Sequence, residues 1–159
     1  MTRILGIDPG YERLGIAILE KTKSSREEVL FSVCFKTDKN LEFAQRLKLI
    51  GVEVKRVIKK YRPEILAIES LFSNTNQKTV MHVSEARGVV IYESINANLK
   101  IFEATPPQIK LAVAGDGRAD KNQIIKMVKM LVDMDNSKMS DDELDAIAIA
   151  LTANAYLKI

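Results

Sequence analysis

Short apolar runs separated by turn residues dominate the first third of the chain. The first run, Arg3–Asp8, ends at Pro9-Gly10, a pair of residues typical of turns. Two more runs follow at residues 14–19 and 28–35, and the second of these is rich in β-favouring Val and Phe. The pattern predicts three strands that form an antiparallel meander.

The middle third of the chain predicts a helix, one buried strand and a second helix. From Leu41 to Tyr61 the apolar residues recur at helical spacing with Lys and Arg between them, and Pro63 ends that helix. Residues 65–68 form an unbroken apolar run, which is typical of a central strand buried on both faces. After a polar loop, residues 79–99 read as a second long helix.

The last third predicts one brief strand and three helices. The strand is residues 101–102, and Pro106 begins a short helix that ends near Val113, because prolines are tolerated in a first helical turn. Asp120 begins an amphipathic helix, and Ser140 begins the last one. The buried stripe of the amphipathic helix contains Ile124, Ile125, Val128 and Leu131. The order of elements predicts one α/β domain over residues 1–159, with a five-stranded mixed sheet flanked by helices.

Composition narrows the class of protein. The chain has 159 residues, of which 47% are hydrophobic and 28% charged, as in ordinary globular domains. Cys34 and His82 are the single residues of their types, which excludes an intrachain disulfide and a zinc site and favours a reducing compartment. The short apolar start is no signal peptide or membrane span, so we expect a cytoplasmic protein. A net charge of +3 permits nucleic-acid binding but does not require it.

Acidic residues placed beside apolar sequence are the main chemical signal. Asp8 ends the first strand and Glu69 directly follows the run at residues 65–68. If these two strands are neighbours in the sheet, both carboxylates are delivered to one edge, where catalytic residues often lie. Each residue alone is more often structural than functional.

The last helix offers two more carboxylates. Ser140 and Glu143 match a capping box, and the acids of this first turn favour the helix dipole, which explains Asp141 and Glu143 without any function. Asp145 differs, because it is the only charge in the apolar stretch that follows. Asp142 lies three residues earlier and shares its helix face, so both could point toward the strand ends.

Four converging carboxylates repel one another, and either protonation or a divalent cation relieves the repulsion. Ligands that are all oxygen suit Mg²⁺ or Mn²⁺. Two such ions roughly 3.5 to 4 Å apart can activate water and stabilise the leaving oxygen of a phosphodiester. The sequence therefore favours a metal-dependent nuclease, in which Asp8, Glu69, Asp142 and Asp145 hold the metal.

Several short motifs, in this order, resemble the crossover junction endodeoxyribonuclease RuvC family over nearly the whole chain. They are Gly6-Ile7-Asp8-Pro9-Gly10, Ala67-Ile68-Glu69-Ser70-Leu71-Phe72, Glu85-Ala86-Arg87-Gly88-Val89, Thr105-Pro106-Pro107-Gln108-Ile109-Lys110, Gly115-Asp116-Gly117-Arg118-Ala119-Asp120-Lys121 and Asp142-Glu143-Leu144-Asp145-Ala146. Each string is weakly specific alone, whereas all of them together are strongly specific. The chain departs from the family at Leu14-Gly15-Ile16-Ala17 and lacks a His near Thr152.

The resemblance implies a ribonuclease H-like fold and an enzyme that resolves Holliday junctions in DNA recombination and repair. It implies that the four carboxylates bind two Mg²⁺ ions, for which Mn²⁺ can substitute. It also implies that Lys110 and Lys121 face phosphates and that Phe72 stacks on a base, although both lysines would otherwise be read as solvated. The implied partners are four-way junction DNA, a second copy of the chain, and the RuvA and RuvB branch-migration proteins.

Some residues and alternatives stay open at this point. Val80, Val83 and Val90 could form the dimer interface or face the core of their own subunit. His82 is read as structural or surface, and Cys34 as a core residue of its strand. The alternatives are an actin-like ATPase, for which 159 residues leave no second lobe, a nonenzymatic junction-binding protein, and a nuclease for broader branched substrates.

Overall fold

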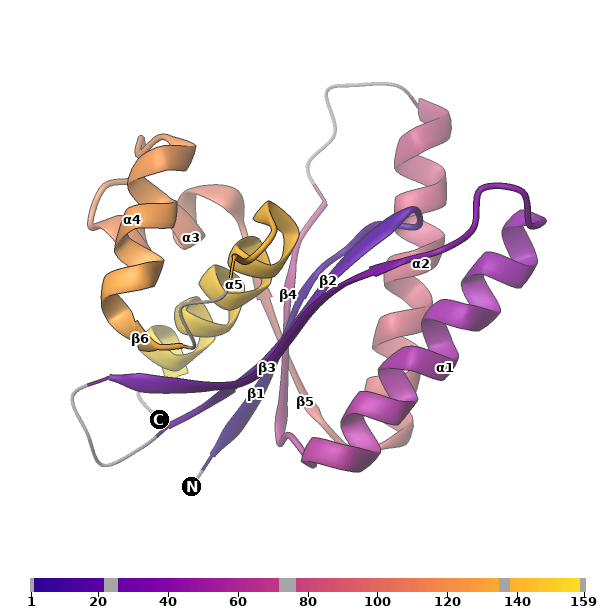
Figure 1. Ribbon diagram of the computed structural model, residues 1–159, viewed down its shortest axis with the longest axis horizontal. Helices are drawn as coiled ribbons and strands as arrows, with labels where there is room; N and C mark the ends of the chain where they lie inside the picture. The colour runs from indigo at the N-terminus through magenta and orange to yellow at the C-terminus, as the bar shows by residue number, and fades with distance from the viewer. Residues whose placement is uncertain (1, 22–25, 72–76, 135–137, 158–159) are drawn as a thin grey trace.

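The computed structural model describes residues 2–21, 26–71, 77–134 and 138–157 (Figure 1). The elements in chain order are β1 (Arg3–Asp8), β2 (Arg13–Glu20), β3 (Glu27–Lys36), α1 (Phe43–Tyr61), β4 (Ile65–Glu69), α2 (Gln77–Asn96), β5 (Lys100–Ala104), α3 (Pro106–Ala114), α4 (Lys121–Leu131), β6 (Val132–Asp133) and α5 (Asp141–Leu157). No helix in these ranges combines the length and apolarity needed to cross a membrane.

Within the described residues, six strands form one mixed sheet in the order β5-β4-β1-β2-β3-β6. The predicted meander is confirmed, because β2 pairs antiparallel with both β1 and β3. β4 pairs parallel with β1, and β5 pairs parallel with β4. The predicted count of five strands misses β6, which pairs parallel with the start of β3 and has only two residues. So short a strand has no alternating pattern that sequence could reveal.

Helices cover both faces of the sheet, with α1 and α2 on one side and α3, α4 and α5 on the other (Figure 1). The alternation of side chains along each strand divides the core accordingly. In β4, Leu66 and Ile68 pack on the side of α1 and α2, whereas Ile65 and Ala67 pack on the side of α5. All four are at most 5% exposed, which confirms the prediction of a strand buried on both faces.

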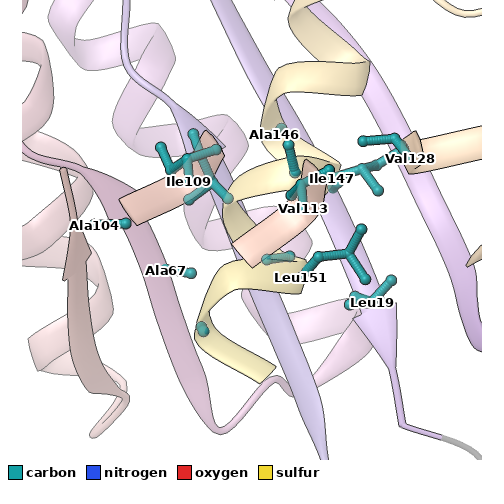
Figure 2. Packing of buried hydrophobic residues seen from close by; sticks show 14 of the residues in the cluster. Leu19, Ala67, Ala104, Ile109, Val113, Val128, Ala146, Ile147 and Leu151 are labelled. Atoms are coloured by element: carbon teal, nitrogen blue, oxygen red, sulfur yellow. The ribbon is translucent and has the colours of Figure 1, made fainter. Parts of the chain in front are cut away.

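The last helix, α5, lies directly on the sheet where Gly6 of β1 meets Ala146 and Ala150. A Cβ added to Gly6 would overlap the backbone carbonyl of Ala146 and approach the Cβ of Ala150, so a larger residue at position 6 would push the helix away from the sheet. Figure 2 shows the packed apolar side chains of this layer. Those labelled are Leu19, Ala67, Ala104, Ile109, Val113, Val128, Ala146, Ile147 and Leu151.

The structure confirms one predicted helix start and corrects one predicted helix end. The start at Asp120 is confirmed, since its side chain accepts a hydrogen bond from the backbone N–H of Gln123 in a capping box. The predicted end at residue 99 is wrong, because α2 ends at Asn96. Asn98 has a φ of 60°, a left-handed conformation that Asn tolerates and a helix does not continue through. The chain can therefore enter β5 earlier than the periodicity indicated.

Candidate active site

The parallel pairing of β1 and β4 positions the first two carboxylates. Ile7 of β1 lies opposite Ile68 of β4, and Asp8 and Glu69 are the residues that follow them. Both strands run in the same direction, so the two acidic residues leave adjacent strands at the same edge of the sheet. This arrangement is the one that the apolar runs predicted.

The start of α5 brings the other two carboxylates to this edge. The backbone N–H of Ser140 donates to Glu143 Oε2 over 2.9 Å, and the backbone N–H of Glu143 donates to the Ser140 hydroxyl over 3.4 Å. This confirms the predicted capping box, which fixes the first turn of the helix. Asp142 lies in that turn, and Asp145 follows one turn later on the same face.

The four carboxylates lie close enough for their charges to act on one another. Burial raises the pKa of Asp8 to about 7, and the negative charges of Asp145, Glu69 and Asp142 add to the effect. Burial and the charge of Asp145 also raise the pKa of Glu69. Burial raises the pKa of Asp145 as well, although Lys121 opposes the rise. The cluster therefore holds its negative charge only at an energetic cost.

Two cations from the surrounding elements pair with the acids of α5. Arg13 Nη2 lies 2.5 Å from Asp142 Oδ2. Lys121 Nζ lies 3.1 Å from Asp141 Oδ2 and 3.6 Å from Asp145 Oδ2. In the described ranges, no three acidic, His or Cys side chains are gathered closely enough to hold a metal ion.

The chemistry of the donor set nevertheless fits a divalent cation. All four candidate ligands supply carboxylate oxygens, which Mg²⁺ and Mn²⁺ prefer, and they come from three elements that converge on one edge. Burial raises the pKa of Asp8, and the three neighbouring carboxylates add to the rise, so a nearby cation would favour its charged form. A bound cation would supply that charge, and it would draw Asp142 and Asp145 away from Arg13 and Lys121.

A groove beside the cluster contains two of the other predicted site residues. Glu69 and Asp145 line it together with Lys110 and Lys121, and Pro106 and Ile109 contribute part of its apolar wall. Both lysines therefore lie next to the carboxylates rather than on a remote solvated face. Phe72, the third residue predicted to contact DNA, lies outside the described residues.

Two further residues contact one of the carboxylates and a third contacts the backbone of Glu69, and none of these roles was predicted from the sequence. Arg13 pairs with Asp142, and the Cys34 thiol lies 3.4 Å from the same Asp142 oxygen. Cys34 is only partly buried, so its interpretation as a core residue needs correction. Arg87 donates through Nε to the backbone carbonyl of Glu69 over 3.1 Å. The signals in the sequence were the position of Arg13 next to the turn after Asp8 and the position of Arg87 inside the Glu85-Ala86-Arg87-Gly88-Val89 motif.

The structure also addresses the residues left open by the sequence. His82 stacks on Phe43 with ring centroids 3.9 Å apart and meets the Tyr11 ring edge-on, which agrees with a structural role. Val90 is fully buried in the core of its own subunit, so it is wrong as a candidate for the dimer interface. Val80 and Val83 are only partly buried.

Comparisons with known proteins agree with this geometry. The chain matches the family described as crossover junction endodeoxyribonuclease RuvC over residues 4–153. It is 42% identical over 149 residues to the RuvC protein of Caldanaerobacter subterraneus subsp. tengcongensis, covering 94% of this chain and 90% of the relative. It is 45% identical over 148 residues to that of Alkaliphilus oremlandii, covering 93% and 90%.

Solved structures show the same likeness in three dimensions. The structure of T. thermophilus RuvC in complex with a Holliday junction substrate superposes with a TM-score of 0.93 at 28% identity, covering 99% of this chain and 96% of that one. The yeast mitochondrial Holliday junction resolvase Ydc2 has a TM-score of 0.69 at 15% identity, covering 95% and 77%, and shares the fold. These likenesses confirm the predicted ribonuclease H-like α/β fold. The chain belongs to the crossover junction endodeoxyribonuclease RuvC family.

Proposed function

We propose that this chain is a structure-selective endonuclease that resolves Holliday junctions by hydrolysing phosphodiesters in DNA recombination and repair. The convergence of carboxylates from β1, β4 and α5, with the pKa of Asp8 raised to about 7, carries the proposal. Membership of the RuvC family supports it, as does the likeness to a relative described with a junction bound. We further propose that residues 1–159 act as a single nuclease domain.

In this proposal Asp8, Glu69, Asp142 and Asp145 hold two Mg²⁺ ions, for which Mn²⁺ can substitute. When bound, such a pair of ions activates water and stabilises the leaving oxygen in an in-line displacement. The carboxylates would hold the ions in place, and the apolar layer under α5 fixes the strands and the helix that carry these carboxylates. The products would carry a 5′ phosphate and a 3′ hydroxyl.

The basic groups beside the cluster would position the DNA strand. Lys110 and Lys121 line the same groove as Glu69 and Asp145, so a phosphate held there would meet both positive charges. Phosphate contacts of this kind make binding salt-sensitive. Phe72 follows the strand that ends at Glu69, and we propose that it stacks on a base at the junction crossover.

The two-fold symmetry of a four-way junction calls for two sites that cut opposed strands. We therefore propose that the chain works as a homodimer. RuvA and RuvB are the proposed partners for branch migration. Val80 and Val83 of α2 remain candidate interface positions, because neither is fully buried.

The test is cleavage of a labelled, immobile four-way junction beside the matching linear duplex, with Mg²⁺, with Mn²⁺ and with chelator. We expect symmetric, metal-dependent cuts in the junction alone. Asp145→Asn should abolish cutting and leave junction binding intact, because it removes a metal ligand without adding bulk. Asp133→Asn is the matched control. Asp133 lies on β6, the strand at the far edge of the sheet, and its exposed side chain pairs with Arg26.

The same assay separates the alternatives. Wild-type cutting by Asp145→Asn would contradict the assignment of the carboxylates. Tight junction binding without cutting under any metal would favour a nonenzymatic junction-binding protein. If flaps and forks were cut as fast as the four-way junction, the chain would be a nuclease for a broader range of branched DNA.

A further inference from the structure

Arg13 is the cationic group that directly contacts Asp142. It is the first residue of β2, and its Nη2 lies 2.5 Å from Asp142 Oδ2. The Cys34 thiol of β3 lies 3.4 Å from the same oxygen, so two side chains from the sheet hold this carboxylate. The Arg13 side chain is 53% exposed, whereas that of Asp142 is 20% exposed. The guanidinium therefore reaches the cluster from the solvent side.

Arg13 and Lys121 approach the acids of α5 from different elements. Lys121 comes from the start of α4 and pairs with Asp141 and Asp145. Arg13 comes from β2 and pairs with Asp142, which lies outside the residues that line the Lys121 groove. The carboxylate cluster thus has a cation on each of two flanks. Only the flank of Lys121 was anticipated from the motifs.

A divalent ion at Asp142 would compete directly with the Arg13 guanidinium. An ion bound by either oxygen of Asp142 would lie within a few ångströms of the guanidinium on Oδ2, and two like charges so close repel each other. The Arg13 side chain is half exposed and can move into solvent, whereas Asp142 is held in the first turn of a capped helix. Metal binding should therefore displace the guanidinium and leave it close to the cluster.

A displaced guanidinium at this edge has the geometry for a phosphate. The planar fork of Arg donates two parallel N–H groups, which match phosphodiester oxygens as well as carboxylates. DNA that brings its scissile phosphate to the carboxylates would carry neighbouring backbone phosphates past the first residue of β2. The group released by the metal would then be available to the substrate.

We propose that Arg13 is a DNA-phosphate contact that Asp142 holds until a divalent ion releases it, so that metal binding and backbone binding are coupled. This inference rests on the proposed function, because it requires both the metal and the DNA. It adds a residue to the substrate surface and gives the Arg13–Asp142 pair a role in the metal-free protein.

The experiment compares wild type, Arg13→Gln and Arg13→Lys. Arg56→Gln is the matched control, since Arg56 is 49% exposed and lies 2.7 Å from Glu53 on α1, away from the cluster. Mn²⁺ affinity is measured on the DNA-free protein by electron paramagnetic resonance. Junction affinity is measured by gel shift over a range of salt concentrations, once with chelator and once with Ca²⁺, which carboxylates bind readily. Denaturing gels of the same samples report any cutting.

We expect Arg13→Gln to bind Mn²⁺ about threefold to tenfold more tightly, because Asp142 no longer has to leave a guanidinium. The same variant should bind the junction about threefold to tenfold more weakly in Ca²⁺ and less than about twofold more weakly in chelator. Its salt slope in Ca²⁺ should fall by about 1, as expected for one lost phosphate contact. Arg13→Lys keeps the charge and should keep the salt slope.

The outcomes separate this inference from the proposed function. If wild type binds Mn²⁺ and the junction, and Arg13→Gln matches Arg56→Gln in Mn²⁺ affinity and salt slope, the inference is wrong and the proposed function stands. An equal loss of junction affinity in chelator and in Ca²⁺ would also overturn the coupling. A wild-type chain that binds neither Mn²⁺ nor the junction would overturn both.

Discussion

Gly15 of β2 faces the backbone carbonyl of Asp142 at the start of α5. A Cβ added to Gly15 would lie closer than 3.0 Å to that oxygen, so the helix can approach the sheet here only because the residue has no side chain. Gly15 also lies opposite Asp8 in the β1–β2 ladder. This close approach sets the position of Asp142 relative to Asp8.

Gly15→Ala should therefore push the start of α5 away from the sheet. We expect a loss of about 1–3 kcal/mol in the free energy of unfolding, as for other overpacked sites. Displaced carboxylates should lower Mn²⁺ affinity and the rate of junction cutting by about tenfold to a hundredfold. Urea unfolding, Mn²⁺ titration and single-turnover cleavage measure the three effects. Unchanged metal affinity in a folded variant would contradict this role for Gly15.

Gly88→Ala should have the opposite effect on stability. Gly88 lies inside α2, and a Cβ added there meets no atom within 4 Å. Ala costs less backbone entropy than Gly in a helix, so the free energy of unfolding should rise by about 0.5–1 kcal/mol. Thermal unfolding of the two glycine variants side by side tests this. A destabilised Gly88→Ala would show that the position is packed against something in solution.

The pKa of Asp8 predicts how the metal-free protein responds to pH. Because the folded pKa is raised from 3.8 to about 7, the folded state binds this proton more tightly than the unfolded chain does. The resulting stability is fully present below about pH 4 and is lost as pH rises through about 7. Metal-free wild type should thus be less stable at about pH 8 than at about pH 5.5 through this group.

Asp8→Asn removes the titrating group and the repulsion. At about pH 8 without metal, the free energy of unfolding of Asp8→Asn should be roughly 2–4 kcal/mol higher than that of wild type, since one pKa unit corresponds to about 1.4 kcal/mol. Urea unfolding in chelator at both pH values measures the difference. Added Mg²⁺ should reverse the order, because it stabilises only the intact ligand set. Equal stability of the two proteins at high pH would contradict the coupled cluster.

The sequence predicted the parts of the site that depend on local pattern. Asp8 and Glu69 follow apolar runs, so their placement at strand ends required only that β1 and β4 be neighbours. Asp145 was identifiable because it interrupts an apolar helix face. In each case a charged residue that interrupts the apolar pattern indicated a candidate site residue.

The remaining parts depend on tertiary register, which no local pattern specifies. Cys34 lies beside Asp142 because β3 pairs with β2 in a register that shifts at an irregularity between Ile18 and Leu19. The early end of α2 depends on the left-handed conformation of Asn98. Such features follow from strand pairing and packing between distant segments, so the local sequence pattern could not reveal them.

Arg87 of α2 predicts a further positioning effect, on Glu69. Its Nε donates to the Glu69 backbone carbonyl over 3.1 Å, and its Nη2 pairs with Glu103 on β5. The Arg87 side chain is only 16% exposed, so the bond is partly shielded from water. It ties the end of β4 to the helix that covers this face of the sheet.

Arg87→Ala should leave the Glu69 carbonyl without this donor and loosen the strand end. We expect a loss of about 1–3 kcal/mol in unfolding free energy and, as for other groups behind a metal ligand, Mn²⁺ binding weakened by about tenfold. Glu103→Gln is the matched control, because it removes the ion pair but leaves the bond to the Glu69 carbonyl. If Glu103→Gln weakened Mn²⁺ binding as much as Arg87→Ala, the ion pair and not the carbonyl bond would position Glu69. If Arg87→Ala lost stability but kept its Mn²⁺ affinity, Arg87 would only support the fold.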